Sequence, residues 1–385
     1  MAEPVTVVMV GIGGYGEVYL SALLDELQST RCRIVGAVDP HPENCARLTE
    51  LEARGVTLHP SLDDYYRVGA ADLAVISSPI HLHCEHVRHA LSQGSHVLVE
   101  KPAAAVTAEV DAMIDARDRA KRFVAVGFQW SFARSILDLK RDILAGRFGV
   151  PSNGRSLTLW PRTEGYYNRN DWAGRKRDAS GRWILDSPAN NAMAHDLHNM
   201  LFLLGNRIDR SAEPVDVSAR LARVNDIETF DTVAARVRTA EGVELLFLAS
   251  HAVADDESVE PRFVLEFADA TVAFPGEAAA ITARFHDGSV VEYPSPNATP
   301  QVAKLWTCIE AVTGDVQIPC GLETARPHTA CIEAIEESGT SPHVFSAQSV
   351  RLSDTPGGRL HWVGGLAAAL KRSYETGQWP AVLRR

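Results

Sequence analysis

Two short motifs in the first third of the chain carry residues whose types and spacing could do chemistry. Gly11-Ile12-Gly13-Gly14-Tyr15-Gly16 has the GxGxxG spacing, follows the apolar run Val5 to Val10 and precedes a stretch of helical periodicity. Glycines at these places allow a tight turn and a close approach of a pyrophosphate, and the helix N-terminus offers free N–H groups. Glu100-Lys101-Pro102 ends a later apolar run. A partly desolvated lysine there could exchange a proton with a bound hydroxyl.

Asp39 bears on which dinucleotide the glycine motif would take. It ends the second apolar run, 23 positions after Gly16, near the distance at which a carboxylate bonds the adenosine ribose hydroxyls. A carboxylate repels a 2′-phosphate, and neither Pro40 nor His41 supplies the Arg or Lys that would bind one. The residues therefore predict NAD and leave NADP open. The alternative is that Asp39 is only a turn residue before Pro40.

Lys101 has both a functional and an ordinary interpretation. It follows Val97-Leu98-Val99, and open α/β sheets bind their ligands at the carboxyl ends of such strands. Pro102 is a plausible cis-proline site. From the residue types alone, a surface Glu-Lys pair at the start of a loop explains the motif at least as well.

The elements that must position these motifs follow two successive patterns. Up to about residue 126, apolar runs at 5–10, 33–38, 73–77, 97–100 and 124–127 alternate with helical stretches at 17–27, 43–54 and 83–93. This alternation predicts a parallel sheet covered on both faces. Runs of period two at 215–224, 232–238, 244–250 and 262–267 then predict mostly antiparallel strands. Further helices are expected at 135–145, 302–312, 323–338 and 362–374.

The predicted fold class is therefore α/β. An N-terminal Rossmann dinucleotide-binding domain is expected at residues 1–126, and a C-terminal α+β domain with a large, mostly antiparallel sheet at 127–340. Residues 341–385 are expected to form an extension with one helix.

Composition excludes several classes of protein. The 385 residues carry a formal net charge of −11, which argues against a nucleic-acid partner. The six cysteines are scattered without a CxxC pair, so reduced thiols are expected rather than a disulfide framework or a zinc site. No apolar run reaches the length of a membrane span and no signal peptide is evident, so a soluble, cytoplasmic protein is expected.

Three segments together resemble one known family. Val7 to Gly16, Ser77-Ser78-Pro79 with His83, and Gly94 to Pro102 are similar to the Gfo/Idh/MocA (glucose-fructose oxidoreductase/inositol dehydrogenase) family. The resemblance is strong over the first 130 residues or so and continues more weakly to about Ser338. It implies oxidation or reduction of a sugar or cyclitol carbon with NAD(P), with the lysine at Lys101 usually catalytic. The implied cofactor-binding residues are Gly11, Gly13, Gly14, Tyr15, Gly16, Asp39, Ser78, Pro79, His83, Glu100, Lys101 and Gln129.

The family's second motif, Asp-x-Gly-x-His-x-x-Asp followed by Leu-x-Gly, is altered in this chain. Anchored on Leu203 and Gly205, it falls on residues 191–198, and His195 matches the family histidine. Asn191, Met193 and His198 replace the aspartate, the glycine and the second aspartate, and Ile80 replaces the usual asparagine after Pro79. The implied catalytic residues are Lys101, His195 and Asn191.

Each altered position has its own expected role. Asn191 cannot take up a proton near neutrality, but its amide can orient a hydroxyl. His198 lies on the same helical face as His195, either as a replacement for the charged partner or as a packing histidine. Asp196 with the two histidines could be read as a metal site. The family gives no precedent for one, so no metal is expected.

The segment around residues 160–172 is unusually aromatic and rich in hydrogen-bonding groups. Aromatic faces stack on sugar rings while arginine, asparagine and aspartate bind hydroxyls, so Arg162, Tyr166, Asn170 and Trp172 are expected on the substrate side together with His198. The alternative is an ordered loop whose aromatic rings pack beneath it or against another subunit. Asp186 is expected to cap the helix that bears His195, with a displaced catalytic acid as the second option.

The leading hypothesis is an NAD-dependent sugar or cyclitol dehydrogenase in which Lys101 exchanges the hydroxyl proton and His195 assists. Two alternatives stay open: an enzyme that retains NAD and hydrolyses or epimerises glycosides by transient oxidation, and a non-catalytic sugar or dinucleotide sensor. The resemblance also implies a homodimer or homotetramer through the open face of the C-terminal sheet.

Overall fold

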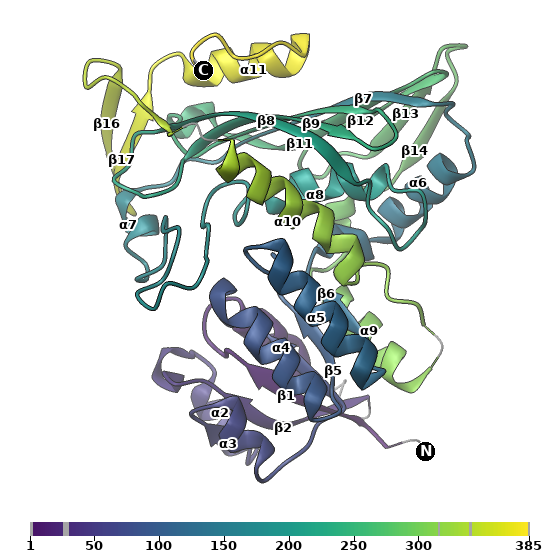
Figure 1. Ribbon diagram of the computed structural model, residues 1–385, viewed down its shortest axis with the longest axis vertical. Helices are drawn as coiled ribbons and strands as arrows, with labels where there is room; N and C mark the ends of the chain where they lie inside the picture. The colour runs from purple at the N-terminus through teal and green to yellow at the C-terminus, as the bar shows by residue number, and fades with distance from the viewer. Residues whose placement is uncertain (1–2, 26–30, 315, 339–340, 384–385) are drawn as a thin grey trace. The chain divides into compact units, whose positions relative to one another are not determined.

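The computed structural model describes residues 3–25, 31–314, 316–338 and 341–383 (Figure 1). Contacts between Cα atoms divide the chain into two units. The first unit comprises residues 1–132 and 300–326, and the second comprises residues 133–299 and 327–385. These boundaries differ from those expected from the sequence, because the chain returns to the first unit at residue 300. The returning segment contains a helix whose Lys304 is buried against Glu100.

The first unit is built on a six-stranded parallel sheet of order β3-β2-β1-β4-β5-β6. Its strands are β1 Val5–Val10, β2 Cys32–Val38, β3 Leu58–His59, β4 Leu73–Ile76, β5 His96–Val99 and β6 Val124–Val126. Every pairing is parallel. Because parallel strands are covered by helices on both faces, their apolar runs are almost continuous, and all four residues of β4 are buried.

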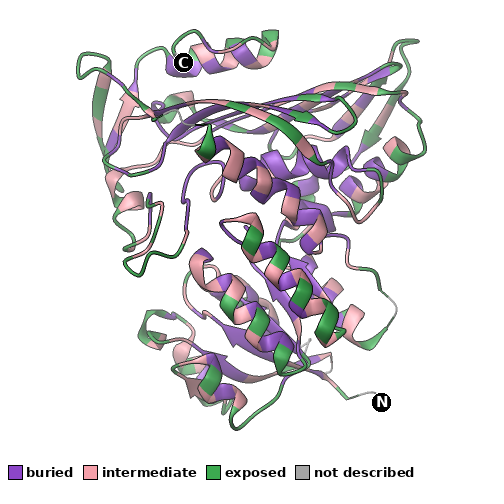
Figure 2. Ribbon diagram, in the orientation of Figure 1, coloured by how far each residue is buried: buried purple, intermediate pink, exposed green. Residues whose placement is uncertain are grey.

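Helices surround this sheet and show one buried and one exposed side (Figure 2). They are α1 Gly16–Leu23, α2 Leu48–Ala53, α3 Leu62–Tyr66, α4 His83–Ser92, α5 Thr107–Ala120 and α9 Ala303–Thr313. The helix expected at 17–27 ends at Leu23, and residues 26 and 27 lie outside the described residues. Helix α10 (Leu322–Glu337) begins in the first unit and continues in the second.

The second unit contains a nine-stranded sheet of order β14-β13-β12-β11-β7-β10-β9-β8-β15. Its strands are β7 Pro151–Leu159, β8 Pro214–Arg223, β9 Thr232–Thr239, β10 Glu244–Ser250, β11 Val259–Phe267, β12 Ala270–Phe274, β13 Ile281–Phe285, β14 Val290–Tyr293 and β15 His343–Val344. Among the described strands of this nine-stranded sheet, only the β7–β10 and β8–β15 pairings are parallel. The predicted fold class, a Rossmann sheet plus a large, mostly antiparallel sheet, is confirmed.

The remaining elements of the second unit lie around this sheet. They are α6 Arg134–Leu144, α7 Glu164–Tyr167, α8 Ala194–Leu203, the hairpin of β16 Val350–Thr355 and β17 Gly358–Val363, and α11 Leu366–Thr376. Short 3₁₀ turns occur at Pro42–Asn44, Ile80–Leu82, Gln129–Phe132, Asp255–Glu257 and Pro296–Ala298.

One helix prediction was wrong at its start. A helix was expected at 362–374, but Trp362 and Val363 belong to β17 and the helix begins at Leu366. Gly365 has a φ of 78°, which a helix interior does not accommodate. The glycine therefore separates the strand from the helix.

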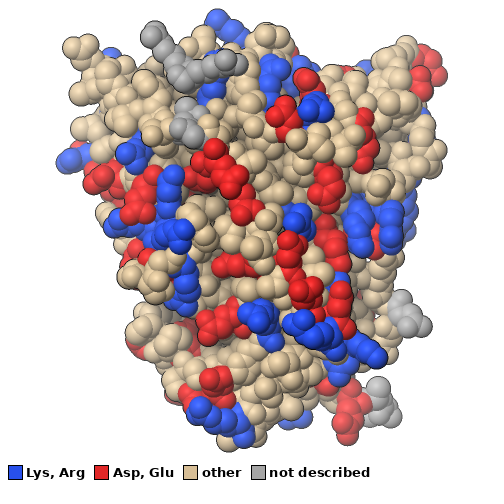
Figure 3. All heavy atoms as spheres, in the orientation of Figure 1, with Lys and Arg blue, Asp and Glu red and all other residues tan. Residues whose placement is uncertain are grey.

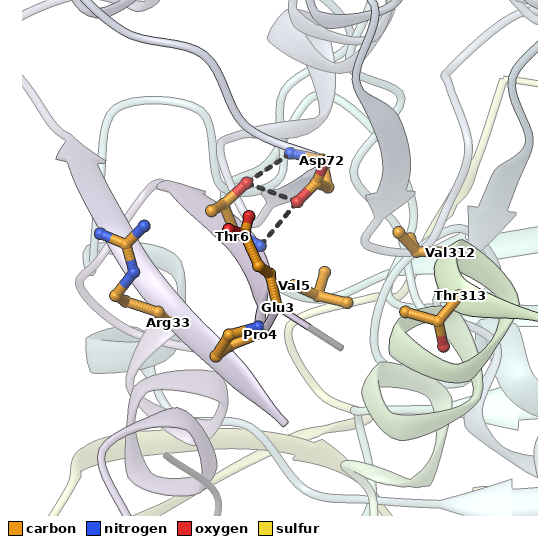
Figure 4. A pocket seen from close by; sticks show the side chains of 8 residues that line it. All are labelled: Glu3, Pro4, Val5, Thr6, Arg33, Asp72, Val312 and Thr313. Atoms are coloured by element: carbon orange, nitrogen blue, oxygen red, sulfur yellow. Dashed lines mark hydrogen bonds between the residues drawn. The ribbon is translucent and has the colours of Figure 1, made fainter. Parts of the chain in front are cut away.

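A pocket of about 500 Å³ opens in the first unit and is shown in Figure 4. Asp72 Oδ2 accepts hydrogen bonds from the Thr6 amide (2.9 Å) and the Thr6 hydroxyl (2.6 Å) at its wall. The pocket is lined by Glu3, Pro4, Val5, Thr6, Arg33, Asp72, Val312 and Thr313. Val312 and Thr313 lie at the end of α9, and the other six residues lie at or near the amino ends of β1, β2 and β4, whereas α/β sheets bind their ligands at the carboxyl ends. The glycine motif follows that other edge.

Two surface properties bear on partners. Basic and acidic side chains are interspersed over the face drawn in Figure 3. Among the described helices, none is long and apolar enough to cross a membrane.

Candidate functional site

The glycine motif forms a tight turn between β1 and α1. Gly11 has a φ of 81°, and a Cβ placed on it would lie 2.8 Å from the Ser77 carbonyl carbon. A Cβ on Gly16 would lie 2.2 Å from the Gly11 oxygen. Side chains are therefore excluded at both positions. A Cβ on Gly14, by contrast, would meet no atom of the described residues within 4 Å. A turn that is tight at its base, open at Gly14 and followed by a helix N-terminus fits the pyrophosphate of a dinucleotide.

Asp39, at the end of β2, is hydrogen-bonded to this turn. Its Oδ2 accepts a hydrogen bond from the Ile12 amide (3.0 Å), and its Oδ1 accepts one from the His41 amide (2.9 Å). Each carboxylate oxygen has a second lone pair. The carboxylate can therefore hold the turn and still accept a ribose hydroxyl, which is compatible with the predicted role.

The carboxyl ends of the neighbouring strands are tied to one another beside this turn. The Ser77 amide donates to Val10 (2.7 Å), the Glu100 amide to Ile76 (2.8 Å) and the Gly127 amide to Val99 (2.8 Å). The predicted cofactor residues after β4, β5 and β6 therefore lie along one edge of the sheet. They are Ser78, Pro79, Glu100, Lys101 and Gln129.

Lys101 and Pro102 are joined by a cis peptide bond, as expected. The Lys101 amide donates to Glu100 Oε2 (3.1 Å). The backbone at the candidate catalytic lysine is thus held by the side chain of the residue before it.

His83 connects two of these strand ends rather than facing solvent. Its Nδ1 lies 2.9 Å from the Pro102 oxygen and its Nε2 lies 2.8 Å from the Ser78 oxygen. Only 1% of the side chain is exposed, and burial lowers the pKa of the imidazole although its carbonyl partners favour the charged form. His83 therefore positions the loops after β4 and β5.

Lys304, which the sequence analysis did not single out, joins three parts of the site. Its ammonium donates to Glu100 Oε1, to the Gly127 carbonyl (3.1 Å) and to the Tyr15 hydroxyl (3.1 Å). Tyr19 donates to the same Glu100 oxygen (2.5 Å). The ammonium also lies 4.7 Å from the Tyr15 ring centre and 5.3 Å from that of Tyr19. One lysine from α9 thus contacts the glycine motif and the ends of β5 and β6.

Glu100 and Lys304 are both charged despite their burial. Burial would raise the pKa of Glu100, but the Lys304 charge and the hydrogen bonds from Lys304 and Tyr19 lower it below its usual value. Burial would lower the pKa of Lys304, but the Glu100 charge raises it. The sequence held one clue to this pair, because Lys304 falls on the same helical face as the buried Cys308.

In the second unit, the buried Asp186 pairs with Asn191, which is half-buried. Asn191 Nδ2 donates to Asp186 Oδ1 (2.8 Å), and the Gly174 amide donates to Asp186 Oδ2 (2.7 Å). The Arg169 guanidinium lies 3.6 Å from that second oxygen. The expectation that Asp186 caps the helix of His195 was wrong. That helix begins only at Ala194, after a series of turns, and Met193 occupies its N-cap.

The aromatic segment contains stacked arginines and tyrosines. The Arg162 guanidinium lies 5.1 Å from the Tyr166 ring centre and 5.6 Å from that of Trp160. The Arg169 guanidinium lies 3.8 Å from the Tyr166 ring centre and 5.2 Å from that of Trp172. Burial and the nearby Asp186 charge raise the pKa of the Tyr166 hydroxyl. Two of the predicted substrate residues, Arg162 and Tyr166, are thus brought together.

Two neighbours of this segment have structural roles. Asn170 Oδ1 accepts hydrogen bonds from the Trp172 amide (3.2 Å) and the Ala173 amide (2.8 Å), which stabilises the turn that follows it. His251 Nδ1 lies 2.7 Å from the Trp160 oxygen. Burial lowers the pKa of His251 to about 3, with a further contribution from the charges of Arg162 and Arg169.

Helix α8 buries two titratable residues next to His195. His198 is 1% exposed and stacks on Phe202, and burial lowers its pKa well below the usual value. This arrangement favours the packing interpretation. Asp196 accepts a hydrogen bond from Thr158, and burial raises its pKa to about 7. Within the described part of the chain, no group of three or more histidine, cysteine, aspartate and glutamate side chains could hold a metal ion.

Sequence comparisons find the family similarity in the first unit. Residues 5–128 match the family model described as "Oxidoreductase family, NAD-binding Rossmann fold", of the Gfo/Idh/MocA group. The chain is 29% identical over 140 residues to 1-carboxy-3-chloro-3,4-dihydroxycyclohexa-1,5-diene dehydrogenase of Comamonas testosteroni, a match that covers 36% of this chain and 35% of the relative. It is 31% identical over 150 residues to inositol 2-dehydrogenase 1 of Saccharopolyspora erythraea, covering 38% of this chain and 43% of the relative. Each match spans well under two thirds of the relative's length.

Comparison with solved structures shows that the fold resembles that of known proteins over most of the chain. The WlbA dehydrogenase from Bordetella pertussis, solved in complex with NADH and UDP-GlcNAcA, superposes with a TM-score of 0.72 over 89% of this chain and 100% of that chain. At 22% sequence identity this similarity establishes the fold alone. The glycine turn, the Glu100-Lys101-Pro102 strand end and the matched model all lie within residues 5–128, the part of the chain that is similar to the Gfo/Idh/MocA oxidoreductase family.

Proposed function

We propose that this chain is an NAD-dependent oxidoreductase that transfers a hydride between nicotinamide and a hydroxyl-bearing carbon of a sugar or cyclitol. One observation carries the proposal. The glycine turn after β1 and the Glu100-Lys101-Pro102 segment after β5 lie on the same edge of one parallel sheet, joined through the end of β4. This edge is where open α/β sheets bind dinucleotides and their reaction partners.

The substrate class rests on the names of relatives and on residue chemistry. The two relatives are named as dehydrogenases of a ring diol and of inositol, and the superposed structure contains NADH and a nucleotide-linked sugar acid. In this chain, Arg162, Tyr166 and Trp172 offer ring faces and donors of the kind that bind polyhydroxylated rings. Asp39 favours NAD, because its carboxylate would repel the 2′-phosphate of NADP.

Lys101 is the proposed proton carrier. Bound NAD would accept the hydride when the alcohol is oxidised and return it in the reverse direction. The Lys101 amine would take the hydroxyl proton as the carbonyl forms and give it back on reduction. The Lys101 amide donates to the Glu100 carboxylate, which helps to fix the backbone that carries the amine.

We also propose roles for His195 and Asn191, which lie in the segment that corresponds to the family's second motif. The Asn191 amide, bonded to Asp186, would orient a hydroxyl group. His195 would assist the proton transfer as the family motif implies. Asp186 supplies a carboxylate next to the position where the family aspartate is missing, so the acidic group is present although its place in the sequence has changed.

The proposal is tested first by binding and then by turnover. NAD is titrated into the purified protein with tryptophan fluorescence as the readout, and reduced nicotinamide is followed by absorbance with inositols, hexoses, hexuronic acids and nucleotide-linked sugars. We expect NAD to bind and one substrate class to reduce it. Lys101→Ala should bind NAD but turn over about 10²- to 10⁴-fold more slowly.

The matched control is Lys121→Gly, because Lys121 is exposed and its φ of 51° suits glycine. This variant should retain full activity. Absence of NAD binding, or an unchanged rate for Lys101→Ala, would contradict the proposal. NAD that stays bound through purification, with glycoside cleavage or epimerisation but no net NADH, would favour the internally cycling alternative.

A further inference from the structure

The hairpin of β16 and β17 has no role in the function proposed above. Its strands pair along their whole length, and Trp362 Nε1 donates to Ser353 Oγ across the hairpin (3.0 Å). A two-stranded hairpin is only marginally stable by itself in water, so it needs another surface to pack on. Leu360 and Val363 of β17 are only 1% and 4% exposed. β17 therefore packs on the rest of the second unit.

One surface that the hairpin contacts is the start of α7 (Figure 1). Thr163 and Leu360 form an antiparallel bridge, and the Thr163 hydroxyl donates to the Gly357 carbonyl (2.6 Å). A Cβ on Gly165 would lie 2.6 Å from the same carbonyl oxygen. The hairpin is therefore fitted so closely to residues 163–165 that it excludes a side chain at Gly165.

A pair of side chains adds a polar contact to this backbone fit. His361 Nε2 lies 2.8 Å from Glu164 Oε1, and the two side chains are 24% and 46% exposed. Because both groups remain in contact with water, the pair adds little to the stability of the whole chain. It does specify a position, since Glu164 is the first residue of α7.

β17 is also bonded to the segment that follows β10. The Val363 amide donates to the Ala252 carbonyl (3.0 Å). Ala252 follows His251, whose ring centre lies 5.6 Å from that of Tyr166 and 6.5 Å from that of Tyr167. One strand of the hairpin thus contacts both segments that bring these aromatic rings together.

Helix α7 depends on such contacts for its position. It has only four residues, Glu164–Tyr167, and its N-cap makes no side-chain hydrogen bond. Helices shorter than about 12 residues are marginal in water unless other parts of the protein stabilise them. α7 carries Tyr166, whose ring centre lies 5.1 Å from the Arg162 guanidinium and 3.8 Å from that of Arg169. A displacement of α7 would therefore move the ring against which both arginines stack.

We propose that the hairpin positions Tyr166 and Arg162 for the substrate, with Thr163 and His361 as positioning residues that act through α7. The inference rests on the proposed function, in which Arg162 and Tyr166 bind a sugar or cyclitol ring. The hairpin itself does not touch the substrate or the cofactor in this role. A weaker attachment of α7 therefore raises KM and leaves kcat and NAD affinity unchanged, because ring binding is lost equally in the ground state and in the transition state.

The test compares two double variants of the full-length chain. The first, Thr163→Val with His361→Leu, removes both polar contacts and keeps side chains of similar size. The second, Thr163→Ser with His361→Gln, keeps a hydroxyl donor and an amide donor for the same two partners. Thr376→Val is the matched control, because its exposed hydroxyl also donates to a backbone carbonyl (2.8 Å) but lies at the end of α11. If the first double variant lacks native circular dichroism, Thr163→Val and Thr163→Ser carry the test as single variants.

Hydrogen exchange of residues 163–168 reports the attachment of α7, and steady-state kinetics use the compound that reduces NAD in the substrate panel. In the first double variant we expect exchange to be about tenfold faster and KM about tenfold higher, the factor that the loss of one or two hydrogen bonds produces. Its kcat and NAD affinity should stay within about twofold of those of the parent chain. The second double variant and Thr376→Val should match the parent chain in every readout.

Unchanged exchange in the first double variant would show that these contacts do not hold α7. Faster exchange with an unchanged KM would show that the position of α7 does not matter to the substrate. An equal rise of KM in the second double variant would exclude the two hydrogen bonds as its cause. Each of these results refutes the inference alone, in a parent chain that turns over. A parent chain that reduces NAD with no compound refutes the proposed function, and the substrate role of the hairpin with it.

Discussion

Lys304 and Glu100 form a buried ion pair across 204 positions of sequence. The same ammonium reaches the Tyr15 hydroxyl in the glycine motif and the Gly127 carbonyl after β6. A Cβ on Gly127 would lie 2.7 Å from a Glu100 carboxylate oxygen, so the carboxylate is fitted closely against that backbone. The helix that follows the second unit's strands thus fixes the residue next to the candidate catalytic lysine.

Lys304→Met should destabilise the protein strongly, because it leaves the Glu100 charge buried without its partner. The expected loss in the free energy of unfolding is about 3–5 kcal/mol, with weaker NAD binding because Tyr15 also loses a contact. Adding Glu100→Gln should recover much of that stability, since the amide can still accept from Tyr19. Urea unfolding and NAD titration measure both effects. Arg67→Met is the control, because Arg67 forms an exposed pair with Asp64 and should change stability by about 1 kcal/mol or less. Equal losses in Lys304→Met and Arg67→Met would contradict the assigned role.

Asp39→Ala should weaken NAD binding and reduce discrimination against NADP. The variant loses the hydrogen bonds to the Ile12 and His41 amides and the negative charge that opposes a 2′-phosphate. We expect NAD affinity to fall about tenfold, in line with the loss of one or two hydrogen bonds to a charged group, while NADP affinity falls less or rises. Parallel fluorescence titrations with the two dinucleotides measure the ratio. An unchanged NAD-to-NADP ratio would assign Asp39 to the turn alone.

Asp196→Asn should alter the pH dependence of stability. Burial raises the pKa of Asp196 from 3.8 to about 7. Between these values the folded chain keeps a proton that the unfolded chain releases, so the parent chain loses stability as the pH rises through this window. Asparagine has no such titration and can still accept from Thr158. Relative to the parent, Asp196→Asn should therefore gain on the order of 2–4 kcal/mol between pH 4 and pH 7. Urea unfolding across that range measures the difference, and parallel stability curves for the two chains would contradict it.

Most of the sheet of the first unit could be predicted from sequence because local patterns determine it, whereas the return of the chain at residue 300 could not. Apolar runs that contain β-branched residues mark β1, β4 and β5, and the glycine spacing marks the turn after β1. In the second unit, β7 was not predicted, because Pro151, Asn153 and Gly154 interrupt its apolar pattern. Pairing with β10 on one side and β11 on the other stabilises this strand despite its own residues.

The side-chain pairs of the site could not be predicted from the sequence, because they join residues whose proximity depends on the fold. Lys304 stands in an ordinary helical pattern, and its partner Glu100 is identified only when α9 packs against the end of β5. The pairing of Asp186 with Asn191 likewise depends on the turns between residues 187 and 193, which no period in the sequence indicates. The break before α11, by contrast, could have been predicted from the Gly364-Gly365 pair. The apolar pattern around Trp362 led instead to a helix that starts too early.

Asn191→Asp restores the acidic residue of the family motif, yet we expect it to destabilise this chain in a pH-dependent way. The Asn191 amide donates to Asp186 Oδ1 at 2.8 Å. Two ionised carboxylates placed this close would repel each other strongly. The pair would retain a proton, so the pKa of one carboxyl group would rise above that of the unfolded chain. A raised carboxyl pKa makes the folded state lose stability as the pH rises.

The variant should therefore unfold at a lower urea concentration than the parent at pH 8, and the difference should shrink at pH 5. Asn170→Asp is the matched control. The Asn170 side-chain oxygen accepts from two backbone amides, and a carboxylate can accept the same two bonds, so this variant should be stable at both pH values. A loss in Asn191→Asp that is the same at pH 5 and pH 8 would mean that the Arg169 charge, 3.6 Å from Asp186, suffices to keep both carboxylates ionised.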